Sequence, residues 1–169
     1  MRHPFERIVS AYNDKMTTNE GQTGHYNEVS RLINKKYKIL RDDPRDRTEP
    51  DDGLATFEDF VNHLVRLGSP WNRDEHWRQY ETICDPCHHN YDVIMKFDTF
   101  YDEFKYIKKY LNVSERHLKA FFPPWKHRTN PNVTSVYMES IPRTLRHQLY
   151  EVYKKDFELF GYEKPSYVL

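Results

Sequence analysis

The opening residues of the chain combine several groups that can bind a phosphate. Arg2 stands directly before a helix that the apolar spacing predicts over residues 4–17. A guanidinium can donate two parallel hydrogen bonds to a phosphate, and a helix N-terminus adds free N–H groups and the positive end of a dipole. Ser10 falls away from the apolar face of this helix, so its hydroxyl is free to face a ligand. The pattern predicts an anion site; the alternative is an ordinary surface Arg and Ser on an amphipathic helix.

The stretch Asp74-Glu75-His76-Trp77 holds the best candidates for proton transfer. Histidine and glutamate act as general bases when their surroundings bring the pKa near the working pH. His76 is our first candidate for a catalytic base, and Glu75 is the second. The alternative is that His76 and Trp77 only pack at the start of a helix.

Cys84-x-x-Cys87 is followed directly by His88 and His89, and three interpretations are open. A Cys-x-x-Cys-His run is a pattern for haem attachment, and Cys and His side chains also bind zinc. The sequence has no further cysteine to complete a zinc site, and nothing else in it indicates haem. We favour the third interpretation, a candidate disulfide between Cys84 and Cys87 or a pair of structural thiols, and we expect no metal.

Two further features belong to the surface. Asn112 and Asn132 each begin an Asn-x-Ser/Thr triplet, the acceptor pattern for N-glycosylation. Six basic residues between 116 and 128 predict either a groove for an anionic ligand or a solvated surface.

Length and composition narrow the class of protein. The 169 residues suit one domain of ordinary size. The 26 Lys and Arg balance 26 Asp and Glu, and this zero net charge argues against a general nucleic-acid-binding protein. Aromatic residues make up 15% of the chain and can supply a core, which excludes a wholly disordered protein. No apolar run approaches the roughly 20 residues of a membrane helix, and the N-terminus lacks the apolar region of a secretory signal.

The elements that must position these groups are mostly helices. Thr56, with Asp59 three residues later, predicts a helix start, and Gly161 predicts the end of the last helix. Only residues 91–97 read as a strand, and a lone strand needs partners, so either other strands escape detection or the chain holds part of a domain. The expected helices cover 4–17, 26–39, about three turns after Thr56, 99–111, a short piece after Ser114, and 141–160, with loops over 18–24, 41–53 and 120–135.

Taken in order, these motifs resemble the Golgi carbohydrate sulfotransferases, in the branch that sulfates GalNAc, chondroitin, dermatan and glucuronyl epitopes. Residues 2–12 look like the family's motif for the 3′-phosphate of 3′-phosphoadenosine 5′-phosphosulfate (PAPS). The joint order of the motifs carries the resemblance, while residues 18–55 and 112–135 match little. The later matches are Phe57-x-x-Phe60-Val61, Glu75-His76-Trp77, Cys84-Asp85-Pro86-Cys87, the stretch 91–99, and Tyr150-x-x-Tyr153-x-x-Asp156-Phe157-x-x-Phe160-Gly161-Tyr162.

The resemblance implies PAPS as co-substrate and a glycan or glycosaminoglycan as acceptor. Transfer of SO₃ to a sugar hydroxyl needs a base, the role that we expect for His76 or Glu75, and Trp77 offers a face on which a sugar can stack. The electrostatic logic of this transfer requires no metal. The family assigns 3′-phosphate binding to Arg2 and Ser10, with the loop and helix between them shaped by His3, Pro4, Phe5, Glu6, Arg7, Ile8 and Val9.

The implied fold is α/β, a parallel sheet with flanking helices related to the P-loop kinases, and the implied location is the lumenal side of the Golgi membrane. The family also carries an N-terminal membrane anchor and an earlier loop around the 5′-phosphosulfate, and these 169 residues contain neither. We therefore expect a single, helix-rich, N-terminally truncated sulfotransferase domain over residues 1–169, its C-terminal portion, with the membrane reached only through the anchor. The alternative function is an inactive fragment or pseudo-enzyme that acts as a binding module.

Overall fold

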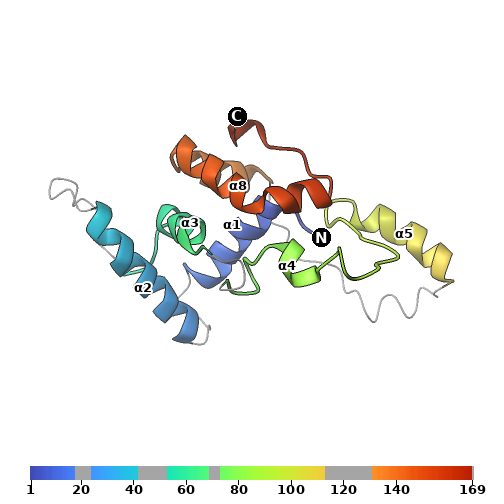
Figure 1. Cartoon of the computed structure of the whole chain (residues 1–169), viewed down its shortest axis with the longest axis horizontal. Coiled ribbons are helices and arrows are strands. Elements are labelled where there is room, and N and C mark those ends of the chain that lie inside the picture. The colour runs from blue at the N-terminus through green and yellow to red at the C-terminus, as the bar shows by residue number, and fades with distance from the viewer. Residues whose placement is uncertain (18–23, 42–52, 69–72, 113–130, 169) are drawn as a thin grey trace.

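The computed structural model describes residues 1–17, 24–41, 53–68, 73–112 and 131–168 (Figure 1). Within these ranges every regular element is a helix. None of the described helices is both long enough and apolar enough to cross a membrane. The elements are α1 (Pro4–Lys15), α2 (Gly24–Arg41), α3 (Phe57–Arg66), α4 (Tyr80–Cys84), α5 (Phe100–Leu111), α7 (Pro131–Glu139), α8 (Arg143–Leu159) and the 3₁₀ turn η2 (Ser166–Val168).

Helix α1 lies in the middle of the molecule and contacts α2, α7 and α8 (Figure 1). Pro4 occupies its first turn, where the missing N–H costs no hydrogen bond. Its apolar face is fully buried through Phe5, Ile8 and Val9. The helix predicted at the N-terminus is therefore confirmed, and its burial fixes Arg2 and Ser10 relative to the core.

Helix α3 packs on α2 and α8, and it begins as predicted. Thr56 accepts a hydrogen bond from the Asp59 backbone N–H at 3.2 Å, and Asp59 accepts one from the Thr56 N–H at 3.1 Å. This reciprocal capping box satisfies two N–H groups that a helix start leaves open. Phe60, Val61 and Leu64 then reach the core with helical spacing.

Helix α8 lies across the core and ends where the sequence predicts. Leu149, Tyr153 and Phe157 on its inner face are nearly inaccessible to solvent. Gly161 follows with φ of +59°, a left-handed conformation that glycine adopts without a steric penalty. Its carbonyl accepts a hydrogen bond from Lys96 Nζ at 2.8 Å, which ties the end of α8 to the segment before α5.

Two helices were not predicted. Helix α7 begins at Pro131, inside the stretch 120–135 that was expected to be a loop, so that expectation is wrong from Pro131 onward. The short α4 follows the candidate base and ends at Cys84. The loops expected over 18–24 and 41–53 are wrong at Gly24 and Arg41, which begin and end α2. Residues 18–23 and 42–52 of these loops, the helix after Ser114 and the basic stretch 116–128 lie outside the described residues.

The strand predicted over 91–97 is wrong as an element, because no strand is formed in the described ranges. The segment is extended, and its backbone pairs only at its end. The Met1 amino group donates to the Met95 carbonyl, and the Phe97 N–H donates to the Met1 carbonyl at 2.5 Å. Met1 thus bonds to residues 95 and 97, two positions apart, and this is the hydrogen-bond pattern of two parallel strands. The described residues thus confirm a helix-rich fold, whereas the parallel sheet of an α/β fold is not among them.

Candidate functional site

Arg2 lies at the start of α1 with an incompletely paired guanidinium. Its side chain is 17% exposed, and its Nε stands 3.6 Å from Glu6 Oε2, one helical turn later, which is an ion pair but too long for a hydrogen bond. The carbon of the guanidinium lies 5.4 Å from the centre of the Phe97 ring. Nε and one terminal nitrogen are buried without a hydrogen-bond partner among the described residues. Buried donors of this kind are costly when unpaired, and the expectation that Arg2 holds a phosphate stays a prediction.

Ser10 is half-buried on α1 and lies off the core. It follows Arg7 by three residues, so the two side chains share one face of the helix. That face meets the segment 74–78, because Arg7 donates to the Glu75 and Arg78 carbonyls, and Lys15 further along lies 4.9 Å from the Tyr26 ring. Ser10 therefore lies beside the Arg7 contacts on α1, and its role in binding a phosphate stays a prediction.

Arg7 acts as a clamp between α1 and this segment. Its Nη1 donates to the Arg78 carbonyl and its Nη2 to the Glu75 carbonyl, each at 2.6 Å. Its guanidinium also stacks 4.2 Å from the centre of the Tyr80 ring. These contacts occupy the guanidinium, so Arg7 positions the segment that carries His76 rather than offering a free cation. Nothing in the local spacing indicates this contact over 71 residues of chain.

The other residues of the N-terminal motif pack rather than point outward. Pro4, Phe5, Ile8 and Val9 are buried in the core, and Glu6 is 7% exposed beside Arg2. The His3 ring meets Phe157 and Tyr162 edge-on, each at 5.2 Å between ring centres. Burial lowers the pKa of His3 to about 4 against a weaker opposing effect of Asp98. His3 is therefore uncharged at neutral pH, and it supplies shape to this end of α1 rather than positive charge.

His76 is held by Asp74 and Tyr26. Its Nδ1 lies 2.6 Å from Asp74 Oδ1, and its backbone N–H donates to the same oxygen at 2.9 Å. The Tyr26 hydroxyl donates to Asp74 Oδ2 at 3.1 Å and lies 3.1 Å from His76 Nδ1. Burial acts to raise the pKa of Asp74, but the hydrogen bonds from His76 and Tyr26 and the His76 charge outweigh it, and the pKa is lowered. Neither Asp74 nor Tyr26 was predicted from the sequence as a partner of His76.

The neighbours of His76 in the sequence have different surroundings. The Glu75 side chain is exposed, while its carbonyl is held by Arg7. Trp77 is only 4% exposed and packs against Phe60, with ring centres 5.3 Å apart. The expectation that Trp77 stacks on a sugar is therefore wrong, because its indole is part of the core. A buried and a sugar-binding tryptophan look alike in a sequence.

Cys84 ends α4 and Cys87 follows three residues later. Both are free thiols, so the candidate disulfide does not join them in the structure; Cys84 is half-buried and Cys87 is exposed. Burial raises the pKa of Cys84 above that of an ordinary thiol. His88 pairs with Asp85 at 2.7 Å on the surface. Across the ranges described, no three His, Cys, Asp or Glu side chains gather in the way that a metal site requires.

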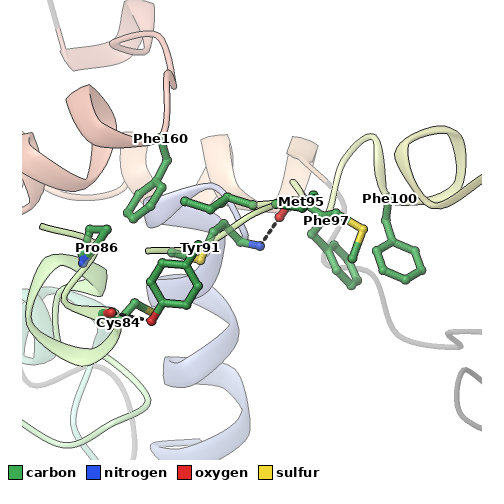
Figure 2. A pocket seen from close by; sticks show the side chains of 10 residues that line it. Cys84, Pro86, Tyr91, Met95, Phe97, Phe100 and Phe160 are labelled. Atoms are coloured by element: carbon green, nitrogen blue, oxygen red, sulfur yellow. Dashed lines mark hydrogen bonds between the residues drawn. The ribbon is translucent and has the colours of Figure 1, made fainter. Parts of the chain in front are cut away.

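An apolar hollow of about 330 Å³ opens beside Met1 (Figure 2). Figure 2 shows Cys84, Tyr91 and Phe160 around it, and a dashed line marks the hydrogen bond to the Met95 carbonyl. No Lys, Arg or His side chain lines this hollow. The phosphate-binding candidates therefore lie at the start of α1 and not in this cavity.

The two glycosylation candidates are both exposed. Asn112 ends α5 in a left-handed conformation, with φ of +51°, and its side chain faces solvent. Asn132 lies in the first turn of α7 and is exposed as well. Ser114, which completes the first triplet, lies outside the described residues, whereas Thr134 of the second triplet is only 3% exposed.

Comparisons with known proteins show which sequences this chain is similar to. The chain is 33% identical to rat (Rattus norvegicus) carbohydrate sulfotransferase 11 over 99% of its own length and 47% of that protein. It is 33% identical to human (Homo sapiens) carbohydrate sulfotransferase 10 over its whole length and 47% of that protein, and 31% identical to human carbohydrate sulfotransferase 9 over 98% and 37%. The chain thus spans about half the length of the curated relatives it matches. No solved structure matches it.

The model of the sulfotransferase family matches residues 1–163, which include the start of α1, the His76 segment, both cysteines and all of α8. The match therefore covers every candidate site residue rather than one motif alone. On this ground the chain belongs to the sulfotransferase family.

Proposed function

We propose that this chain forms the 3′-phosphate side and the acceptor-activating side of a PAPS-dependent carbohydrate O-sulfotransferase. The names of its relatives support sulfate transfer to a glycan, and a glycosaminoglycan is one such acceptor. The observation that carries the proposal is the buried guanidinium of Arg2, with two nitrogens that no described residue satisfies. We place its action in the Golgi lumen, as the resemblance of its motifs implies.

The donor is held by charge and hydrogen bonds. Arg2 donates to the 3′-phosphate from its guanidinium, and the Ser10 hydroxyl donates a further hydrogen bond from the same helix. Charge-assisted hydrogen bonds of this kind are about twice as strong as neutral ones. The N–H groups at the start of α1 add to the positive potential there. The reaction runs on positioning and electrostatics, so this chain needs to supply no metal.

His76 is the proposed base that accepts the proton of the acceptor hydroxyl. Its imidazole is 34% exposed, so an acceptor can reach it, and the Arg7 clamp holds its segment against the helix that binds the donor. Exposed Glu75 remains the second candidate, without the hydrogen bonds that orient His76. General base catalysis contributes roughly 10²- to 10⁴-fold to a rate.

The experiment is calorimetric titration of the chain with adenosine 3′,5′-bisphosphate, the product that retains the 3′-phosphate. We expect saturable binding that falls at least about tenfold in Arg2→Ala, since one charge-assisted hydrogen bond is worth about 1.5–3 kcal/mol. Adenosine 5′-phosphate, which lacks the 3′-phosphate, is expected to bind Arg2→Ala and the unmodified chain alike. Arg143→Ala, an exposed arginine at the start of α8, is the matched control. Equal affinity of Arg2→Ala and Arg143→Ala for the bisphosphate would refute the proposal.

A further inference from the structure

The orientation of the His76 ring follows from what its Nδ1 faces. Asp74 Oδ1 lies 2.6 Å away, and the Tyr26 hydroxyl oxygen lies 3.1 Å away. The carboxylate can only accept a hydrogen bond. The Tyr26 hydroxyl already donates to Asp74 Oδ2, so its oxygen too is available as an acceptor. A lone pair on Nδ1 would point at the Asp74 oxygen, so Nδ1 carries the proton and the lone pair of the neutral ring lies on Nε2.

Each partner stays in the state that this arrangement needs. The lowered pKa of Asp74 keeps the carboxylate ionised at neutral pH. Burial, and then the charge of Asp74, raise the pKa of Tyr26, so its hydroxyl keeps its proton. The Lys15 ammonium lies 4.9 Å from the centre of the Tyr26 ring and 3.0 Å from Asp14 Oδ2. The three groups thus form a stable chain of hydrogen bonds from Tyr26 through Asp74 to His76.

The backbone around His76 is fixed on both sides. Arg7 holds the carbonyls of Glu75 and Arg78, and the buried indole of Trp77 anchors the residue directly after His76. The Asp74 carbonyl accepts from the N–H groups of Trp77 and Arg78 at 3.1 and 2.8 Å, which closes the turn. Nε2 has no hydrogen-bond partner within the described part of the chain, and the ring remains partly exposed.

We propose that Asp74 and Tyr26 are positioning residues that hold His76 in one tautomer and orientation, with Nε2 presented as the base for the acceptor hydroxyl. This inference rests on the proposed function. In the reaction, Nε2 takes the hydroxyl proton as the sugar oxygen bonds to sulfur. The bond between sulfur and the 5′-phosphate oxygen breaks, and its electron pair leaves with adenosine 3′,5′-bisphosphate. Asp74 stabilises the imidazolium, which then releases its proton to water.

The test reads the tautomer directly and needs no turnover. Long-range ¹H–¹⁵N correlation spectra of the full chain, labelled with ¹⁵N-histidine, are recorded at alkaline pH, where imidazoles are neutral. We expect His76 as the Nδ1–H tautomer alone. Asp74→Ser retains a hydroxyl that can cap the His76 backbone N–H but is too short to reach the ring. In this variant we expect the His76 signals to move to an exchanging mixture with the proton largely on Nε2.

The pair of His88 and Asp85 provides a matched control, because His88 Nδ1 lies 2.7 Å from Asp85 Oδ1. Unlike His76, the His88 side chain is 79% exposed. Asp85→Ser is expected to leave the His76 signals unchanged. Tyr26→Phe is expected to retain the Nδ1–H tautomer and to broaden the His76 signals, since one of two supports is lost.

The proposal is overturned when His76 shows the same tautomer mixture in the unmodified chain and in Asp74→Ser. That result leaves bisphosphate binding at Arg2 untouched, and a failure of bisphosphate binding leaves the tautomer result standing, so the two proposals fail separately.

Discussion

The Arg7 clamp gives the sharpest prediction about how the site is held together. Replacing Arg7 by Ala removes two hydrogen bonds of 2.6 Å to the Glu75 and Arg78 carbonyls and the stacking on Tyr80. Arg7→Lys keeps the positive charge but cannot donate to two carbonyls at once in a fork. The pair of variants therefore separates the loss of charge from the loss of geometry.

The expected magnitude follows from these contacts. A hydrogen bond to a charged group contributes about 1.5–3 kcal/mol, and the lower limit applies here because the bond to Glu75 is exposed. An exposed cation–π contact adds about 0.5–1 kcal/mol. Arg7→Ala, which loses both hydrogen bonds and the cation–π contact, is then expected to lower the free energy of unfolding by about 3.5–4 kcal/mol, and Arg7→Lys by about half of that. For a chain of this length, 1 kcal/mol corresponds to roughly 2–4 °C in Tm.

Thermal unfolding followed by circular dichroism measures both variants, with Arg143→Ala as the exposed arginine control. Surface substitutions of that kind normally change stability by less than about 0.5 kcal/mol. Amide hydrogen exchange in the unmodified chain and in Arg7→Ala adds a local readout, and we expect faster exchange at Trp77 and Arg78. A Tm of Arg7→Ala within 1 °C of the Arg143→Ala control, on the order of the effect of a surface change, would refute the clamp.

Three further predictions concern the frame of the site. Thr56→Ala removes the capping box of α3 and is expected to cost about 1 kcal/mol in a urea titration, whereas Thr56→Ser is expected to restore it. Burial lowers the pKa of His3 to about 4 in the folded chain, whereas an unfolded histidine has a pKa of about 6.5. As the pH falls below about 6.5, the unfolded chain is therefore protonated at His3 before the folded chain, and the stability contribution of neutral His3 is lost between about pH 6.5 and about pH 4. The urea midpoint should therefore fall from pH 7 to pH 5, and less so in His3→Phe; equal falls in both proteins would contradict this. Exposed Cys87 is expected to react with maleimide before half-buried Cys84, as peptide mass spectrometry shows by the order of labelling; labelling of Cys84 first would contradict the structure.

Local signals in the sequence were enough to locate the helices that frame the site. Pro4 and the apolar spacing from Phe5 to Tyr12 predict α1, and Thr56 with Asp59 predicts the start of α3. These signals act within a few residues, because capping and amphipathic spacing are properties of a single helix. The resemblance of the motifs was enough to predict the family, which the match over residues 1–163 confirms.

Where the outcome depends on distant partners, prediction from sequence failed. Residues 91–97 have the composition of a strand, yet in the described ranges Met1 is the one residue that bonds to their backbone in a strand pattern, and no strand forms. Trp77 was expected to meet a sugar, but it packs against Phe60 and Tyr26. A strand forms only when another strand pairs with it, and a tryptophan is buried only when other side chains pack around it. Local spacing in the sequence shows neither of these partners.

The sequence by itself was enough to name Arg2 and Ser10 as candidate phosphate ligands, because Arg2 lies just before one predicted helix and Ser10 lies within it. Only the tertiary structure decided how the rest of the site is built. Two buried Arg2 nitrogens have no hydrogen-bond partner among the described residues, and Arg7 donates to two carbonyls about 70 residues away. Tyr26 donates to Asp74, which lies 48 residues later in the chain. The physical reason is that a hydrogen bond or a buried charge depends on which groups meet in space, and that is decided when the helices pack on one another.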